Sequence, residues 1–110
     1  TTLKTYSTAS FMVLDADTQR NLELIKSMRD QTEKGTLLEI IDNTVTSMGG
    51  RKLRQWILQP LLEVDLVNTR LDAVEELKNQ IHLQEELREA LNQIYEIERL
   101  ITRIRFLLLF

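Results

Sequence analysis

Residues that break helices are scarce in this chain, and this scarcity is the strongest constraint on its fold. Three glycines and one proline occur among 110 residues. Between them, long stretches carry apolar residues at steps of three and four, which is the spacing of one helix face. The sequence therefore predicts an all-α fold of about five helices, preceded by a short extended N-terminal segment.

The first part of the chain predicts an extended run and then a helix. Residues 11–15, FMVLD, are the best candidate for the extended run. The helix is expected to begin near Asp15, whose carboxylate can accept hydrogen bonds from free backbone N–H groups. It is expected to end in the segment DQTEKG, where Gly35 can adopt the left-handed conformation. Its apolar face would contain Leu22, Ile25 and Met28.

A short second helix is predicted to begin at Thr36. Thr36 and Glu39 form the pattern T-x-x-E, the capping box in which each side chain satisfies a free backbone donor of the other residue. The segment DNT, residues 42–44, ends this helix because such side chains bond to their own backbone. The apolar residues of this helix are Leu37, Leu38, Ile40 and Ile41.

The third helix is predicted within TVTSMGGRKLRQWILQPL, residues 44–61. Thr46 or Ser47 can cap its start. Pro60 lacks an N–H group and biases the preceding residue away from the helical conformation, so the helix stops there. Its apolar face is expected to contain Leu53, Ile57 and Trp56, with Trp56 as the main packing residue.

Two longer apolar stripes follow, in a fourth helix from about Val64 to Gln80 and a fifth from about Leu83 to Ile104. A short turn at residues 79–82 would let these helices pair as an antiparallel hairpin. Charge pairs on their surface contribute ~0.2–0.5 kcal/mol each, far less than the roughly 1.5–3 kcal/mol of a buried Leu or Ile. The stripes contain Val67, Leu71, Val74, Leu77 and Ile81, and then Leu87, Leu91, Ile94, Ile97, Ile101 and Ile104; the charge pairs are Glu85 with Arg88 and Glu96 with Arg99.

Charge is unevenly distributed, although the formal net charge is only -3. Residues 63–98 contain ten acidic and three basic residues, and residues 99–110 contain three arginines and no acidic residue. The acidic stretch would repel a phosphate backbone and is a poor DNA-binding surface. The chain has no cysteine, which excludes disulfides and thiolate metal sites and fits a reducing compartment.

Neither end of the sequence predicts a membrane segment. The start, TTLKTYSTAS, lacks the apolar run of a secretory signal. The apolar run Phe106 to Phe110 is far shorter than the about 20 residues that a transmembrane helix needs. It is interpreted as part of an element whose packing partner lies outside the given sequence.

The pair Gly49 and Gly50 raises the question of a phosphate-binding loop. A P-loop requires G-x-x-x-x-G-K-[ST] after a strand, whereas these glycines are adjacent and Lys52 is followed by Leu53. The favoured interpretation is that small residues let the helix start lie close to a neighbour, and an anion site at the helix N-terminus is the alternative. The nearby cations, expected on a solvated or salt-bridged helix face, are Arg51, Lys52 and Arg54.

No other group of residues predicts chemistry. His82 is the single histidine and has no cysteine beside it, so a metal or catalytic role is disfavoured. Neighbouring acids on a helix point in different directions and form a solvated surface. Tyr95 is expected to be a half-buried core aromatic. We therefore predict no catalytic, cofactor-binding or metal-binding residues in this chain.

Four blocks of the sequence, in order, resemble the MutS family of DNA mismatch-recognition ATPases. They are FMVLDADTQRNLEL, GTLLEIIDNTVTSMGGRKLRQWILQPL, NTRLDAVEEL and LREALNQIYEIERLITRI, and together they span residues 11–104. The resemblance is to the N-terminal part of the helical core or lever region. After the last block the family continues into a polar turn, whereas this chain reads RFLLLF.

The resemblance implies residues 1–14 as a connector segment leading into the core. Residues 15–110 would form the helical core, or lever, domain, truncated at its C-terminus. The implied function is a structural element of a dimeric parent protein that couples the state of its ATPase to clamping of mismatched duplex DNA. Its partners would be the connector, clamp and ATPase domains of the same chain and the dimer partner, in the cytoplasm of a prokaryote and without a membrane.

The motifs that carry the chemistry of that family are missing from the sequence. The phenylalanines precede Met12 and Leu107 or end the chain, so no Phe-x-Glu motif occurs, and no Walker A loop occurs. The resemblance therefore implies that ATP and magnesium bind elsewhere in the parent protein, and this chain is expected not to be an enzyme. Two alternatives stay open: a stand-alone helical protein-interaction module, and a DNA-binding module that uses the basic start of the third helix.

Overall fold

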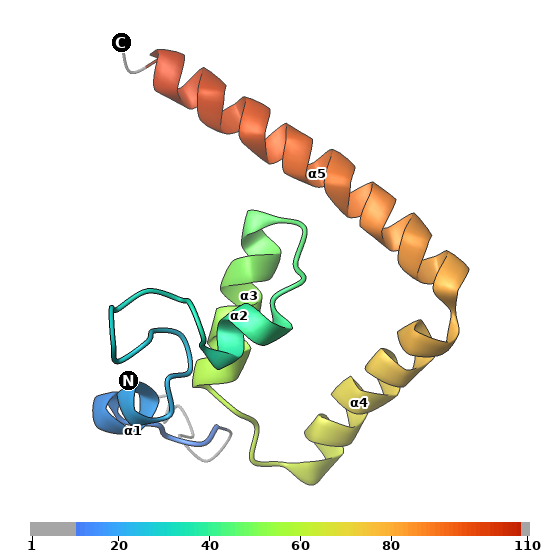
Figure 1. The fold of residues 1–110 in the computed structure, drawn as a ribbon. Helices are drawn as coiled ribbons and strands as arrows, with labels where there is room; N and C mark the ends of the chain where they lie inside the picture. The colour runs from blue at the N-terminus through green and yellow to red at the C-terminus, as the bar shows by residue number, and fades with distance from the viewer. Residues whose placement is uncertain (1–10, 109–110) are drawn as a thin grey trace, which may run out of the picture.

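The computed structural model describes residues 11–108, and five helices make up this part of the chain (Figure 1). Helices α1 to α3 lie together, whereas α4 and α5 lead away from them as an open arm (Figure 1). Over the described range the one pairing of strand type is an isolated antiparallel bridge between Phe11 and Leu61. The all-α prediction with five helices is confirmed. The helices are α1 (Ala16–Asn21), α2 (Leu37–Ile41), α3 (Ser47–Leu58), α4 (Val64–Asn79) and α5 (Ile81–Leu108).

The segment before α1 lies beside the end of α3. In addition to the bridge at Phe11, the backbone N–H of Met12 donates to the carbonyl oxygen of Pro60 at 2.7 Å. This contact agrees with the extended run expected from residue 11. Residues 1–10, which belong to the expected connector, lie outside the described range.

Helix α1 begins as predicted and ends earlier than predicted. The Asp15 carboxylate accepts from the backbone N–H of Thr18 at 2.7 Å and caps the start. The end is a Schellman motif: Leu24 N–H donates to Gln19 O at 3.3 Å, and Glu23 N–H donates to Arg20 O at 3.1 Å. Glu23 adopts the left-handed conformation, with φ 48°.

This early end makes the predicted apolar face of the first helix wrong. Beyond Leu22 the chain runs through turns, so Leu22, Ile25 and Met28 do not form one helical stripe. Leu22 and Met28 are exposed, while Leu24 is buried. The left-handed residue was expected at Gly35, which has φ 79° but lies just before α2 rather than at the end of α1.

The capping box of α2 forms with one change of partner. The Thr36 hydroxyl accepts from Glu39 N–H at 3.2 Å. The Glu39 carboxylate accepts from the N–H of Gly35 rather than from that of Thr36. Of the four apolar residues predicted for this helix, only Leu38 is buried in the core. Leu37, Ile40 and Ile41 are exposed.

Helix α4 matches its prediction, but the predicted hairpin with α5 is wrong. α5 begins at Ile81, so Gln80 is the sole residue between the two helices. An antiparallel helix pair needs a loop of about 2–5 residues for the chain to reverse, and Figure 1 shows α5 turning away from α4 instead. The two stripes therefore do not close on each other, and in α4 and α5, both described throughout, no residue is buried.

The buried core is correspondingly small. Among the described residues the buried apolar side chains are Leu24 and Leu38, joined by Ser27, Thr36 and Thr46. The Cα radius of gyration is 17.7 Å, compared with about 13 Å for a compact domain of this length. Tyr95, expected to be half-buried in a core, is 42% exposed on α5. The chain thus presents its long helices as an arm rather than as a closed bundle.

Candidate functional site

The start of α3 combines a side-chain cap with a close backbone approach. The Thr46 hydroxyl accepts from Gly49 N–H at 3.0 Å, which confirms the predicted cap. A Cβ atom at Gly49 would lie 3.0 Å from that same hydroxyl oxygen and 3.4 Å from the Thr44 Cβ. At Gly50 the nearest atom would lie 3.5 Å away. The expected close approach is therefore present, and it occurs at Gly49, where it requires a residue without a side chain.

The segment before α3 is held by the side chain of Asp42. Its carboxylate accepts from the Thr44 hydroxyl at 2.7 Å and from the Thr44 backbone N–H at 2.9 Å. The Thr44 hydroxyl, followed by its backbone N–H, lowers the pKa of Asp42 below the ordinary value of 3.8. This side-chain to backbone bonding ends α2 as predicted and fixes the approach to α3.

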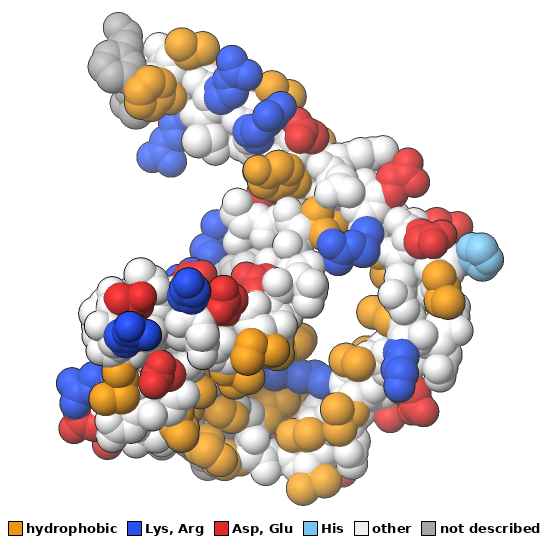
Figure 2. All heavy atoms as spheres, viewed as in Figure 1, with side chains coloured by type: hydrophobic (Ala, Val, Ile, Leu, Met, Phe, Trp, Pro, Cys, Tyr) orange, Lys and Arg blue, Asp and Glu red, His pale blue; other side chains and the backbone are white. Residues whose placement is uncertain are grey.

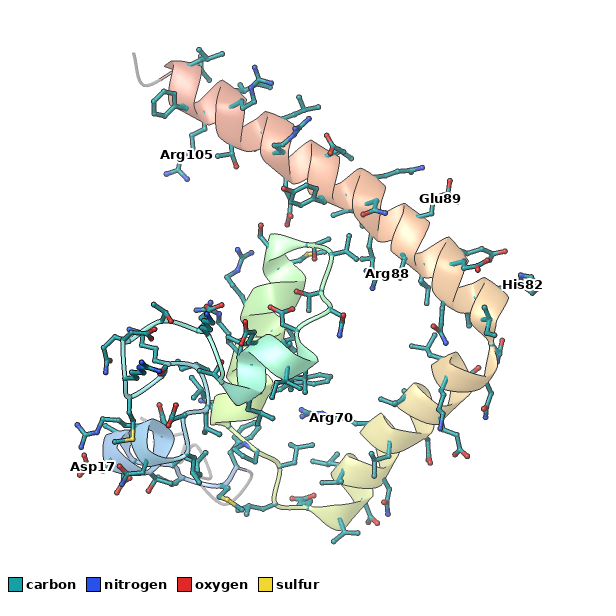
Figure 3. The ribbon with its side chains drawn as sticks, viewed as in Figure 1. Asp17, Arg70, His82, Arg88, Glu89 and Arg105 are labelled. Carbon is teal, nitrogen blue, oxygen red and sulfur yellow. The ribbon has the colours of Figure 1, made fainter. Side chains whose placement is uncertain are left out.

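Helix α5 is fastened to this segment by two polar contacts between residues far apart in the sequence. The Arg88 guanidinium donates to the Asn43 carbonyl oxygen at 3.0 Å. The Glu98 carboxylate accepts from the backbone N–H of Ser47 at 3.2 Å. Figure 3 shows Arg88 pointing from α5 toward the loop between α2 and α3. We call these two contacts, with residues 43–49, the junction.

The Glu98 contact changes the interpretation of the helix N-terminus. The first N–H groups of a helix lack intrahelical partners and attract negative charge. At α3 the Glu98 carboxylate and the Thr46 hydroxyl already bind two of these donors. The alternative of an external anion site at this terminus therefore competes with a carboxylate of the chain itself.

An open groove of about 450 Å³ lies at the junction between α3 and α5. Its lining is mainly apolar and includes Val45, Met48 and Leu91, together with the cationic residues Lys52 and Arg88. Within residues 11–108 no cluster of three metal-ligating side chains occurs. The groove has the character of a packing surface and contains no convergent set of chemical groups.

A third contact joins α4 to α3. The guanidinium of Arg70 lies 3.9 Å from the centroid of the Trp56 ring, a cation–π arrangement. Trp56, which was expected to be the main packing residue of α3, is 41% exposed and therefore only partly buried. Because α3 meets α4 at this end and α5 at the other, its two ends position the two halves of the arm (Figure 3).

The three basic residues of α3 behave as expected for a solvated, salt-bridged face. Arg54 forms an ion pair with Glu33, whose side chain is half-exposed like its own. Arg51 and Lys52 are exposed. One cation of the three is therefore engaged within the chain, which weakens this face as a phosphate-binding surface.

The remaining sequence candidates lie apart from the junction. His82 has a side chain that is 99% exposed, lies 3.9 Å from Glu85, and points away from the rest of the chain (Figure 3). Of the two expected charge pairs, Glu96 with Arg99 forms at 2.7 Å. The other does not form as predicted, because Arg88 reaches Asn43 instead of Glu85.

Arg88 and Glu98, the two residues of α5 that take part in the junction, were not identified from the sequence. Arg88 was assigned to a local pair and Glu98 to a solvated acidic face, because periodicity records spacing along one helix and gives no information about a contact 51 residues away. The contact between Arg70 and Trp56 was not indicated by the sequence either. The Thr46 cap and the close approach at Gly49 were predicted, since both depend on local sequence.

Comparison with known proteins places the chain in one family. Residues 17–107 match the family model described as MutS domain III. The DNA mismatch repair protein MutS of Ruminiclostridium cellulolyticum is 50% identical over 99 residues, which cover 90% of this chain and 11% of the relative. The proteins of the same name from Clostridium botulinum and Acetivibrio thermocellus are each 48% identical over the same coverage.

The chain thus spans about a tenth of the length of the curated relatives that it matches, 11% in each of these three. None of the helices in the described range is long and apolar enough to span a membrane. The match to the family model covers most of the chain and includes the junction, α4 and nearly all of α5. This chain belongs to the MutS family and matches its domain III.

Proposed function

We propose that this chain is a structural core and lever segment of a MutS-like mismatch-recognition ATPase. Its role is to couple the state of the ATPase to the clamping of DNA. The observation that carries the proposal is the match of residues 17–107 to MutS domain III. The supporting geometry is a 28-residue helix, about 42 Å long, fastened at the junction to the α2–α3 segment.

A coupling element must transmit displacement without bending. Packed helices and their connections move as units, which is how many switching proteins carry a change between distant sites. Arg88 and Glu98 attach α5 at two points ten residues apart, and Arg70 attaches α4 at a third. Three attachment points that do not lie on one line restrict rotation of the arm about any single contact.

In this proposal the chemistry belongs to other parts of the parent protein. ATP and magnesium bind in an ATPase domain, and the mismatch is contacted by another module. Residues 1–14 act as the connector and residues 15–110 as the core domain. The segment would work in the cytoplasm, beside the connector, clamp and ATPase domains of its own chain and the dimer partner.

A hybrid protein tests the proposal. Residues 11–108 of this chain replace the aligned segment of the Ruminiclostridium cellulolyticum MutS protein, and ATP hydrolysis is measured with matched and mismatched duplexes. The hybrid is expected to keep a mismatch-dependent rate. Replacing Arg88 and Glu98 by alanine in the hybrid should reduce that dependence while hydrolysis without DNA continues. A folded hybrid that hydrolyses ATP at the same rate with both duplexes contradicts the proposal.

The isolated chain supplies the complementary test. It is expected neither to hydrolyse ATP nor to prefer a mismatched duplex. Hydrolysis by the purified chain, or tighter binding of a mismatched than of a matched duplex, would overturn the assignment of chemistry to other modules. Salt-sensitive binding to any duplex at submicromolar concentration would instead favour the DNA-binding alternative.

A further inference from the structure

The break between α4 and α5 contains none of the residues that usually interrupt a helix. Residues 77–84 read LKNQIHLQ, without proline, glycine or serine. Sharp bends occur at such residues, or where a side chain inserts into the backbone hydrogen bonds. The apolar stripe predicted for the fourth helix also crosses the break, because it includes Ile81, the first residue of α5. The local sequence is therefore compatible with one continuous helix from Val64 to Leu108.

The side chain of Gln84 inserts at this break. Its Nε2 donates to the Leu77 carbonyl oxygen at 2.6 Å and lies 3.5 Å from the carbonyl oxygen of Lys78. The Leu77 oxygen also accepts from the Gln80 N–H at 3.2 Å. In a continuous helix these carbonyl groups would instead accept from the N–H groups four residues further on. The Gln84 amide thus takes the place of backbone donors at the end of α4.

The bent form and a continuous form differ by interactions of similar strength. A continuous helix would add backbone hydrogen bonds from residues 81–83, since the first N–H groups of a helix lack partners within it. The bend keeps the stacking of Arg70 on Trp56 and both contacts of the junction, which a straight rod could not keep together in this geometry. Each of these interactions contributes a small net free energy of the same order. One additional hydrogen bond at the break can therefore decide between the two forms.

The surroundings of the break leave room for such a change. Figure 2 shows open space between this part of the arm and helices α2 and α3. Gln84 itself is partly buried on the inner side of the bend. A rearrangement at the break therefore does not require the core around Leu38 to be repacked.

We propose that the α4–α5 connection is a hinge with two forms and that Gln84 holds the bent one. With its amide on the Leu77 carbonyl oxygen, α4 and α5 stay separate and α5 is directed along the junction. When this hydrogen bond and the junction contacts are released, residues 64–108 form one continuous helix. The proposal concerns the direction of the arm and is independent of the function proposed above.

Distances between two spin labels distinguish the forms. The chain has no cysteine, so labels at Thr69→Cys and Thr102→Cys, both at exposed positions, are unique. In a continuous helix these positions lie about 50 Å apart, and a bend at Gln80 brings them closer. Double electron–electron resonance gives the ratio of the short to the long distance. The labelled wild-type chain should show the short one.

The role of Gln84 is measured in a chain released from the junction by Arg88→Ala and Glu98→Ala, in which both distances should be populated. Adding Gln84→Met keeps the length of the side chain and removes the donor. It should lower the ratio of short to long distances about three- to tenfold. Gln93→Met, at an exposed glutamine of the same helix, is the matched control and should leave the ratio within about twofold.

Three results would overturn the proposal. If no variant shows the distance of about 50 Å, the continuous form does not exist. If Gln84→Met and Gln93→Met give equal ratios, the amide does not hold the bend. If the released chain shows only the long distance while Gln84 is present, the junction alone holds it. Circular dichroism separates straightening, which keeps or raises the helical signal, from unfolding, which lowers it.

A second measurement covers the case in which the released chain unfolds. Trifluoroethanol favours helix, so a titration of the labelled chain with its junction intact should convert the short distance into the long one. Gln84→Met should need less trifluoroethanol at the midpoint than Gln93→Met. Equal midpoints would overturn the proposal as well.

Discussion

Arg70 lies over the face of Trp56, with 3.9 Å between the guanidinium carbon and the ring centroid. This contact joins α4 to α3 although the indole is 41% exposed. The stabilisation supplied by Trp56 therefore comes partly from burial and partly from the cation above it.

Replacing Trp56 tests this division. Trp56→Ala should lower the free energy of unfolding by about 1–2 kcal/mol, less than the roughly 3–5 kcal/mol of a fully buried tryptophan. A double-mutant cycle with Arg70→Ala should give a coupling of about 0.5–1 kcal/mol. Urea unfolding followed by circular dichroism measures all four proteins. Additive losses would show that the stacked geometry contributes no stability.

The adjacent glycines of α3 should respond differently to alanine. Gly50→Ala should stabilise the chain by about 0.5–1 kcal/mol, because its Cβ would make ordinary contacts and alanine favours the helix. Gly49→Ala gains the same preference but presses its Cβ against the capping hydroxyl of Thr46. It should be less stable than Gly50→Ala by about 1 kcal/mol, the usual contribution of a cap. Equal midpoints of thermal unfolding would contradict the close approach.

Thr36 combines a cap with burial. Its hydroxyl accepts from Glu39 N–H and donates to the carbonyl oxygen of Glu33 at 2.6 Å, and the residue is 1% exposed. Thr36→Ala should cost about 1–2 kcal/mol of unfolding free energy. Thr69→Ala, at an exposed position of α4, is the matched control and should change stability by less than about 0.5 kcal/mol. Similar losses in the two variants would show that the α2 cap has no special role.

Acid should weaken the approach to α3. The pKa of Asp42 is lowered, so its carboxylate form is favoured in the folded state. Its contribution is therefore complete above the ordinary value of 3.8 and is lost as the pH falls through the lower pKa of the folded chain. Thr44→Val removes the donating hydroxyl and should reduce this part of the pH dependence, while Thr44→Ser should keep it. Urea midpoints between about pH 7 and about pH 2.5 measure the difference.

The two acids near the middle of α5 separate a long-range contact from a local one. Glu98→Ala removes the acceptor of the Ser47 amide and should cost about 0.5–1.5 kcal/mol. Glu96→Ala loses an exposed pair with Arg99 and should cost only ~0.2–0.5 kcal/mol. Hydrogen exchange of the Ser47 amide should accelerate in the first variant and not in the second. Unchanged exchange in both would show that the junction is not fastened by Glu98.

Local features of this fold were predictable and long-range ones were not. The caps at Asp15, Thr36 and Thr46, and the stop at Pro60, follow from side chains within a few residues of the groups that they satisfy. The end of α1 was missed because its left-handed position is held by Glu23, a residue that gives no turn signal. A glycine at position 23 would have indicated the end of α1.

The arrangement of α4 and α5 was predicted wrongly for a different reason. Two apolar stripes separated by a few polar residues favour a hairpin, but α5 begins at Ile81 and leaves too short a connection to reverse the chain. An apolar stripe predicts which face of a helix packs against another element, but it does not identify that element. The junction likewise depends on Arg88 and Glu98, whose partners lie in a distant part of the sequence.

The connection through Gln80 has a geometrical consequence for the far end of the arm. Because Gln80 alone separates α5 from α4, a change at this residue redirects the whole 28-residue helix. A change of about 10° in its direction moves its tip by about 7 Å, given a length of about 42 Å. The direction of α5 is therefore set by two contacts along its length, that of Arg88 with Asn43 near its start and that of Glu98 with Ser47 near its middle, and loss of both would allow a displacement of this size at Leu108.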